Sequence, residues 1–439
     1  MAKFTTGSIA KHINTMTLAW AIWILSIFLV DFVDMYFLSL LWESELAAAI
    51  WFAWVLLFLL TSIGIALMIT MSSIVSRVIG KKDETRAKQY AMNIYYFAFF
   101  LSIPVTSIAY FFSPEILSLM WAQAQTLEYA ISYFRIVVLV YPFLMLWMCM
   151  SWVLRWVWDA KMSMMPTLIA GWVNIVLDPI LIFWFGWLIE LAAIATSLSR
   201  IALFSVWTYW VWRHSFFLFC NCFWLKNDLR EILSIFMPSL ATNVATPIGT
   251  SFMLKVISEY WDDAVAWMAV MGRLIPVIFV YIFALSGSIG SIVWQNYVAW
   301  LYDRVKEAII KSIMISWVYV LLISVLLFFW NDYLIELFHL TWDWKILIQF
   351  YSTFLVIFFV FNAMNFVWNA TFNVVWKAYI SMILNFLRSI VFLLPFVFFF
   401  SWMWGVKWVL IWEALSISLT GVITLFLLYK FVRSLWIKQ

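Results

Sequence analysis

Residues 163–185 read SMMPTLIAGWVNIVLDPILIFWF, and this stretch decides the fold class. It is apolar over more than the roughly 20 residues that a helix needs to cross a bilayer. Asp178 interrupts the apolar run, and Asn174 precedes it by one helical turn. A charged group inside a bilayer is costly and usually has a function. The stretch therefore predicts a transmembrane helix that carries a functional acid.

Apolar runs of this kind recur along the whole chain. Of its 439 residues, 67% are hydrophobic and 11% are charged, and the mean hydropathy is +1.01. These values indicate an all-α integral membrane protein. We predict twelve transmembrane helices, over residues 14–41, 48–75, 90–112, 126–150, 163–185, 190–212, 229–256, 264–292, 306–330, 346–370, 378–400 and 405–433.

The basic residues predict the orientation in the membrane. Most of the 26 Lys and Arg residues fall in alternate loops, and the loops between these carry mainly Asp and Glu. Since basic residues collect in cytoplasmic loops, both termini are expected in the cytoplasm. The net charge of +4 resides in these loops. It therefore gives no reason to expect a nucleic-acid partner.

The two halves of the chain resemble each other in sequence. The linker at 155–164 resembles the segment at 375–382, and the acidic turn at 41–45 resembles the one at 260–263. Six spans return the chain to its starting side, so two six-helix lobes with the same polarity are expected, related by a pseudo-two-fold axis. Carriers of this type typically hold substrate between the halves near the midplane. We predict an N-lobe at 1–212, a cytoplasmic linker at 213–228 and a C-lobe at 229–439.

Four membrane-embedded residues predict a cation site. Asn174 and Asp178 share a helix face because they are four residues apart, and Pro179 removes a backbone donor beside them. Asp34 and Thr196 would complete a cage of oxygen atoms suited to a hard cation or a proton. Alternatively, Asp34 is a hydrated residue at a helix end and Asn174 forms only an interhelical hydrogen bond.

Other polar residues are expected to line a cavity. Asparagines spaced along the tenth span are more typical of interhelical hydrogen bonds than of ligand contacts. Glu413 has no evident partner, which leaves a cavity role and a local hydrogen bond as alternatives. Arg388 is expected near a span end, where its side chain snorkels toward water. The predicted cavity residues are Asp31, Tyr36, Asn243, Asn362, Asn365 and Glu413.

Tryptophan and glycine occur in unusual numbers, 32 against 11. Several tryptophans stand in turns or at helix ends, where glycine suits the backbone. Because some bacteria read UGA as glycine and others as tryptophan, we interpret many of these tryptophans as glycines in the cell. Trp172 and Trp294 are then expected to crowd their neighbours. The alternative is a membrane protein with genuine aromatic belts.

The chain resembles the multidrug and toxic compound extrusion (MATE) transporters, especially their DinF-like branch. The resemblance runs over nearly the whole chain and is clearest at residues 33–37, 154–161, 166–178 and 294–297. It implies the MATE fold and a cation site in the N-lobe. By residue match, this site comprises Asp34, Asn174, Asp178, Thr196 and the backbone carbonyl of Ala192.

The resemblance also implies a function. Family members export amphiphilic, often cationic compounds in exchange for Na⁺ or H⁺, without another cofactor. We therefore expect a monomeric antiporter in the bacterial cytoplasmic membrane that works by alternating access. A lipid-linked oligosaccharide flippase is the alternative, although a flippase predicts a basic central cavity. A membrane enzyme would need clustered reactive residues, and we identify no such cluster in the sequence.

Overall fold

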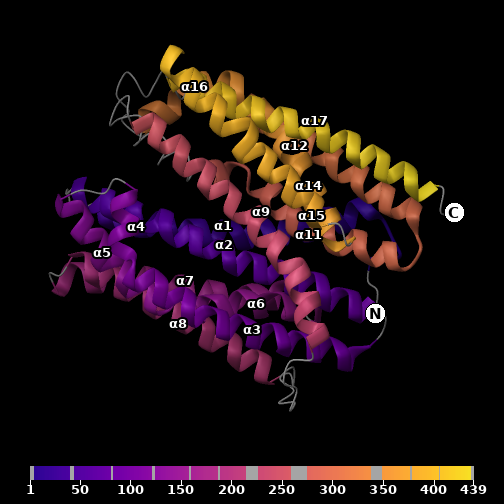
Figure 1. The fold of residues 1–439 in the computed structure, drawn as a ribbon, viewed down its shortest axis with the longest axis horizontal. Coiled ribbons are helices and arrows are strands. Elements are labelled where there is room, and N and C mark those ends of the chain that lie inside the picture. Colours follow the sequence, from indigo (N-terminus) through magenta and orange to yellow (C-terminus); the bar gives the residue numbers. More distant parts are fainter. Residues whose placement is uncertain are drawn as a thin grey trace. The chain divides into compact units, whose positions relative to one another are not determined.

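The computed structural model describes residues 4–39, 44–80, 83–120, 124–157, 160–185, 188–213, 226–258, 274–337, 349–375, 378–404 and 406–436. All regular structure in these residues is helical (Figure 1). Up to residue 258 the helices are α1 (Ile9–Ser39), α2 (Ser44–Gly80), α3 (Glu84–Phe111), α4 (Ser113–Leu119), α5 (Ala124–Leu139), α6 (Tyr141–Val157), α7 (Ala160–Phe185), α8 (Leu188–Arg213) and α9 (Lys226–Ser258).

Several helices after residue 273 contain irregular turns. Two segments, Tyr351–Leu355 and Leu387–Leu393, are π-helical, and the short segment Val356–Phe358 is a 3₁₀ helix. In chain order the elements are α11 (Val280–Val298), α12 (Tyr302–Leu337), η1 (Tyr351–Leu355), η2 (Val356–Phe358), α14 (Phe359–Val374), α15 (Ala378–Phe386), η3 (Leu387–Leu393), α16 (Leu394–Trp404) and α17 (Val406–Trp436).

Each of the twelve predicted spans overlaps helical residues in the described part of the chain, and residues 40–41, 264–273, 346–348 and 405 of four spans lie outside it. Eight of the described helices are long and apolar enough to cross a membrane, and a bent pair raises this number to nine. The segment Thr167–Leu177 of α7 is a shorter apolar helix. The prediction of an all-helical membrane protein is therefore confirmed.

The fourth predicted span, 126–150, is not one continuous helix as expected. Gln125–Leu139 and Tyr141–Ser151 meet at an angle of 51°. Pro142 explains the break, since it has no N–H to donate to the carbonyl of Val138 and its ring clashes there. The new helix starts instead with bonds from Phe143 and Leu144 to the carbonyl of Val140.

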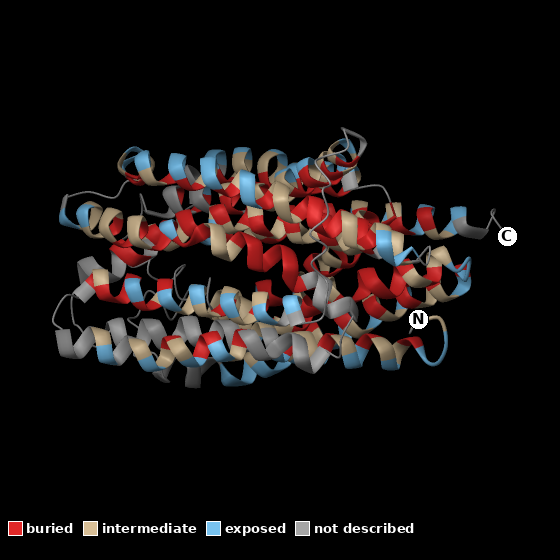
Figure 2. Cartoon of the chain, turned by 90° about the horizontal axis from the view of Figure 1, so that it is seen from below, coloured by how far each residue is buried: buried red, intermediate tan, exposed pale blue. Residues whose placement is uncertain are grey.

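The exposed face of α12 is apolar. Leu322, Phe328 and Phe329 are 59%, 55% and 75% exposed, whereas Val320 and Ser316 on the other face are buried. Figure 2 shows helices on which buried and exposed residues lie on the same turns. Exposed apolar surface of this extent is unfavourable in water. The face is therefore suited to lipid.

The chain divides into two compact units. Unit 1 contains Met1–Ala21 and Ala245–Gln439, and unit 2 contains Ile22–Val244. Both boundaries fall inside helices, one in α1 and one in α9, so each of these helices contributes residues to both units. The predicted lobe boundaries at 212 and 229 remain a prediction.

In unit 1, hydrogen bonds tie the start of α1 to α11. The hydroxyls of Thr17 and Ser288 are 2.8 Å apart, and both residues are buried. The Tyr281 hydroxyl donates to Asn14 Oδ1 at 2.6 Å. A buried polar group is costly unless it is hydrogen-bonded, so these pairs fix the position of α1 within unit 1.

In unit 2, charged hydrogen bonds tie the start of α9 to α3. Arg86 Nη2 donates to Asp228 Oδ1 at 2.6 Å, and Asn93 Nδ2 donates to Asp228 Oδ2 at 2.8 Å. One turn further along α9, Glu231 accepts a bond from the Tyr90 hydroxyl at 2.6 Å. Asp228 is 1% exposed. We call these five residues the α3–α9 network.

The turn between α11 and α12 has the form of a Schellman motif. Leu301 N donates to Asn296 O at 2.9 Å, and Trp300 N donates to Tyr297 O at 3.2 Å. Within the described residues, Trp300 is the one residue other than glycine with a positive φ, at 60°. Glycine is preferred at this position because a side chain there costs about 1–2 kcal/mol.

Replacing Trp300 with glycine is expected to raise the free energy of unfolding by about 1 kcal/mol. The indole is 74% exposed, so little packing is lost, although its edge contact with Tyr302 offsets part of the gain. Thermal unfolding in detergent measures the change. The control is Trp317→Gly in the middle of α12, which should lower stability by about 1 kcal/mol. If the Trp300→Gly protein is as stable as the wild type or less stable, this account is contradicted.

The codon interpretation itself remains a prediction. In protein purified from its source cells, the mass of the peptide that ends at Arg304 would identify residue 300 directly. The expectation that Trp172 crowds its neighbours is wrong, because this side chain is 67% exposed and faces outward from α7. Trp294 is buried at 5% exposure and stacks on Tyr297.

Candidate cation site

The predicted cation-site residues all belong to unit 2, whose limits are Ile22–Val244. Three of their helices supply them: α1 carries Asp34, α7 carries Asn174 and Asp178, and α8 carries Ala192 and Thr196. Helices α7 and α8 pack along each other as an antiparallel pair (Figure 1). The structure therefore brings two of the three predicted elements together.

The connection between α7 and α8 sets the depth of these residues. Residues 186–187 separate the two helices, so Asp178 and Thr196 each lie about 12 Å from the connection at 1.5 Å per residue. Ala192 lies one turn closer to it. Asp178 and Thr196 are consequently at the same level of the helix pair, as a shared cation site requires.

The described side chains of this helix pair are well shielded. Asn174 is 2% exposed and Ala192 is 4% exposed, while Thr196 is half-buried. The Thr196 backbone carbonyl accepts a bond from the Ser199 hydroxyl at 2.8 Å. The buried amide of Asn174 and the half-buried hydroxyl of Thr196 thus lie within about one helical turn of the level of Asp178.

Four predicted site residues have side chains outside the described part of the structure. They are Asp31, Asp34, Tyr36 and Asp178. Their backbones are helical, and Asn174 and Asp178 are one turn apart on α7 as predicted. Asp34 and Asp178 as cation ligands, and Asp31 and Tyr36 as cavity residues, therefore remain predictions.

The predicted cavity residues of the second half take part in hydrogen bonds. Thr424 Oγ1 donates to Asn365 Oδ1 at 2.6 Å, which joins α17 to α14. Asn243 Nδ2 donates to Ser239 O of its own helix at 2.7 Å. The prediction of interhelical hydrogen bonds along the tenth span is thus confirmed for Asn365.

One expectation about a charged residue is corrected by the structure. Arg388 is not near a span end but in the middle of the apolar segment Tyr379–Phe399, and its Nη1 donates to Asn362 Oδ1 at 2.9 Å. Arg388 and Asn362 lie on different helices, and a single sequence does not show which faces of distant helices meet. For Glu413, a cavity role and a local hydrogen bond remain the two predictions.

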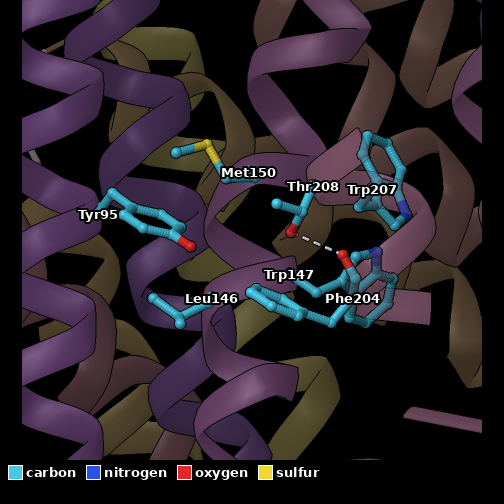
Figure 3. A pocket seen from close by; sticks show the side chains of 7 residues that line it. All are labelled: Tyr95, Leu146, Trp147, Met150, Phe204, Trp207 and Thr208. Atoms are coloured by element: carbon cyan, nitrogen blue, oxygen red, sulfur yellow. Dashed lines mark hydrogen bonds between the residues drawn. The ribbon is translucent and has the colours of Figure 1, made fainter. Parts of the chain in front are cut away.

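A small pocket in unit 2 was not predicted from the sequence. It lies among α3, α6 and α8, and Figure 3 shows its lining side chains. They are Tyr95, Leu146, Trp147, Met150, Phe204, Trp207 and Thr208. Thr208 Oγ1 donates to Phe204 O at 2.8 Å, which leaves a mostly apolar, aromatic wall. The concentration of aromatic residues was the signal available in the sequence.

The pocket is too small for an organic substrate. Its accessible volume is about 10 Å³, roughly the room for one water molecule. The indole N–H groups of Trp147 and Trp207 are buried and have no acceptor among the described residues. An indole N–H only donates, so these groups favour a hydrogen-bond acceptor and give no support to a cationic ligand.

The MatE family profile matches residues 20–180 and again residues 238–399, which together exceed half of the chain. The chain is 25% identical over 426 residues to the FAD transporter of Shewanella oneidensis, covering 95% of this chain and 94% of that protein. It is 24% identical over 286 residues to the multidrug export protein MepA of Staphylococcus aureus, covering 64% of this chain and 63% of MepA.

Solved structures show the same fold. A MOP superfamily transporter from Pyrococcus furiosus aligns with a TM-score of 0.91 at 20% identity, over 99% of this chain and 98% of that one. An outward-facing multidrug resistance MATE family transporter gives a TM-score of 0.89 at 20% identity, with the same coverage of both chains. The fold is that of the twelve-helix MATE transporters. The chain therefore belongs to the MatE family, and it is a multi-pass membrane transporter of the MATE efflux type, not an enzyme.

Proposed function

We propose that this transporter is an antiporter that exports amphiphilic, cationic compounds or toxic metabolites in exchange for Na⁺ or H⁺. The coupling ion binds in unit 2 at Asp34, Asn174 and Asp178, with Thr196 and the carbonyl of Ala192 completing the site. The protein works as a monomer in the bacterial cytoplasmic membrane, with both termini in the cytoplasm.

One observation carries this proposal. Asn174 is buried on α7, one turn from Asp178, and the antiparallel packing of α7 on α8 puts Thr196 at the level of Asp178. An acid at this depth in an apolar helix is costly unless an ion or a proton balances it. A carboxylate with neutral oxygen ligands suits Na⁺, and a carboxylate that accepts a proton suits H⁺.

The names of the relatives support an organic substrate. One relative is a multidrug export protein and another is an FAD transporter. We therefore propose amphiphilic organic compounds as the substrate class.

Helices α1 and α9 provide a route for coupling. Each has residues in both compact units, and α1 carries Asp34 in its unit 2 part. In this proposal, ion binding at Asp34 changes the free energy of one α1 conformation relative to another. A ligand shifts an equilibrium only by its difference in affinity for the two states.

The proposal predicts dye transport driven by an imposed ion gradient. Purified protein in liposomes should move a fluorescent cationic dye when either a Na⁺ gradient or a pH gradient is applied, and the effective gradient identifies the ion. Liposomes without protein provide the control. If the rate of dye transport is the same with and without each ion gradient, antiport is contradicted. No dye transport by folded protein would favour the lipid-linked oligosaccharide flippase, to be tested next with a lipid-linked sugar.

A further inference from the structure

The α3–α9 network lies where helix α9 begins. Asp228 is in the first turn of α9 and Glu231 follows one turn later, so their bonds hold the start of this helix on α3. The three members on α3 are Arg86, Tyr90 and Asn93, which are four and three residues apart. This spacing puts all three on one face of α3. The network therefore joins one face of α3 to the first two turns of α9.

The contact between the two helices continues beyond the network. Phe97 lies one turn after Asn93 on α3, and its ring meets the ring of Phe236 on α9 edge-on, with centroids 5.2 Å apart. Later residues of α3 thus contact later residues of α9, so the two helices run in the same direction and begin at the same end. The segments before them, 77–83 and 213–225, are predicted to be cytoplasmic. In that orientation the network is at the cytoplasmic end of the helix pair.

The polar and the aromatic parts of this contact differ in how easily water replaces them. Phe236 is 3% exposed, and water offers no favourable substitute for its contact with Phe97. The Arg86 side chain is 33% exposed, so water can hydrate the guanidinium when its bond to Asp228 opens. A charged bond at such a partly hydrated position has a modest net strength. The network is therefore the part of the contact that is suited to opening.

The backbone of α9 is weakened just beyond this contact. Pro247 has no N–H to donate to the carbonyl of Asn243, and this carbonyl accepts a bond from Ser62 Oγ of α2 at 3.4 Å. Pro238 removes a second backbone donor from the same helix, and sharp bends in helices are usually found at prolines. The boundary between the two compact units follows Val244, inside this stretch. Residues 226–244 of α9 can therefore change their angle while the rest of the helix stays folded.

We propose that the α3–α9 network is a latch, closed in one conformation of the transport cycle and open in the other. This proposal rests on the export function proposed above, in which the protein alternates between two states. The structure shows the closed latch, which holds residues 226–244 of α9 on α3. In the open latch, water hydrates the charged groups and the start of α9 moves away from α3.

A reversible cross-link tests whether the latch must open during transport. Asn93→Cys and Asp228→Cys are combined in a protein whose native cysteines are replaced by serine, and a short bifunctional thiosulfonate reagent joins the two thiols. The native side chains are 2.8 Å apart, so a short reagent spans the gap. Cross-linking is expected to lower the initial rate of gradient-driven dye transport by about tenfold or more, because the cycle then lacks its open state. Reduction of the cross-link should restore the rate.

The matched control is a cross-link within one helix. Glu307 and Lys311 form an ion pair one turn apart on α12, so Glu307→Cys and Lys311→Cys give the reagent a similar pair of thiols without joining two helices. This cross-link should leave the rate of dye transport unchanged. Transport at the full rate by the protein that is cross-linked between α3 and α9 would overturn the latch.

A distance measurement separates failure of the latch from failure of export, since it needs no transport. Thr85 and Arg230 are exposed near the starts of α3 and α9, and spin labels at these two positions report the separation of the helix starts. Two distances are expected. Arg86→Gln should raise the population of the longer one about threefold, because it removes the charged bond to Asp228. Arg86→Lys should give a smaller rise, since it keeps the charge.

Tyr90→Phe is the second variant, in case Arg86→Gln does not fold. It removes only the hydroxyl that donates to Glu231, and it should shift the two populations in the same direction. Identical distances and populations in the parent protein and the folded variants would refute the latch. If the parent protein transports no dye under any gradient, the export proposal fails, while a shift toward the longer distance in the variants would still support the latch.

Discussion

Asp178→Asn is expected to abolish ion-driven dye transport, lowering the initial rate by a factor of about 100, which corresponds to about 2.7 kcal/mol. The asparagine side chain has nearly the same shape but has no charge to balance a cation and takes up no proton. In a low-dielectric site the loss of this charge is large. The measurement is the initial rate of dye uptake into liposomes under the effective gradient.

Two further substitutions make this prediction specific. Asn174→Ala removes one neutral ligand and should lower the rate by about tenfold, since a hydrogen bond or ligand to a charged group contributes about 1.5 kcal/mol. Glu190→Gln is the control, because Glu190 is a half-buried acid in the first turn of α8. It should transport at nearly the wild-type rate. An Asp178→Asn protein that keeps more than half of its activity would refute the site.

Asp228→Ala is expected to lower the free energy of unfolding by about 2 kcal/mol. Asp228 is 1% exposed, and it accepts a charged hydrogen bond from Arg86 and a neutral one from Asn93. Its removal leaves the buried Asn93 amide without this acceptor. Because the Arg86 side chain is 33% exposed, water compensates part of the loss, and the effect stays below that of a fully buried pair.

A surface ion pair provides the control for Asp228→Ala. Lys311 and Glu307 form an exposed pair on α12, with side chains that are 38% and 39% exposed. Glu307→Ala should change the free energy of unfolding by less than about 0.5 kcal/mol. Thermal unfolding in detergent compares the two variants. Equal effects would show that the α3–α9 network contributes no more than a surface pair.

The sequence predicts the helices of this protein well because the signal is local. Each span needs only about 20 consecutive apolar residues, and such a run is visible without knowledge of its neighbours. The break at Val140 was missed although Pro142 is visible in the sequence, because the apolar run continues across it. The π-helical segment at Leu387–Leu393 is harder to predict, since it depends on how the surrounding helices accommodate Pro395.

Pairs between distant helices could not be predicted from one sequence. Asn362 and Arg388 are 26 residues apart on separate helices, and only the structure shows that Arg388 Nη1 donates to Asn362 Oδ1 at 2.9 Å. By contrast, Asn174 and Asp178 are four residues apart, and helical periodicity alone puts them on one face. The Asn174 and Asp178 pair of the candidate cation site was therefore predictable along α7, while the bond between Arg388 and Asn362 required the structure.

The tryptophans at possible glycine positions could be predicted only in part from the sequence. The abundance of tryptophan in turns indicated glycine positions, and the structure gives Trp300 a φ of 60° in a Schellman motif. Trp172, in contrast, has ample room on the exposed side of α7. Composition suggests that some tryptophans stand at glycine positions. Backbone geometry distinguishes a tryptophan at such a position from one that has ample room.

The central claim is that export and ion movement are coupled in opposite directions. Coupling between two ligands is reciprocal, so a dye gradient should drive the ion just as the ion gradient drives the dye. The most direct measurement adds cationic dye outside liposomes that contain the protein and a fluorescent indicator for Na⁺ or pH inside. Dye entry accompanied by exit of one ion, and loss of both movements in Asp178→Asn, is the predicted result. Dye entry without movement of either ion would contradict the account.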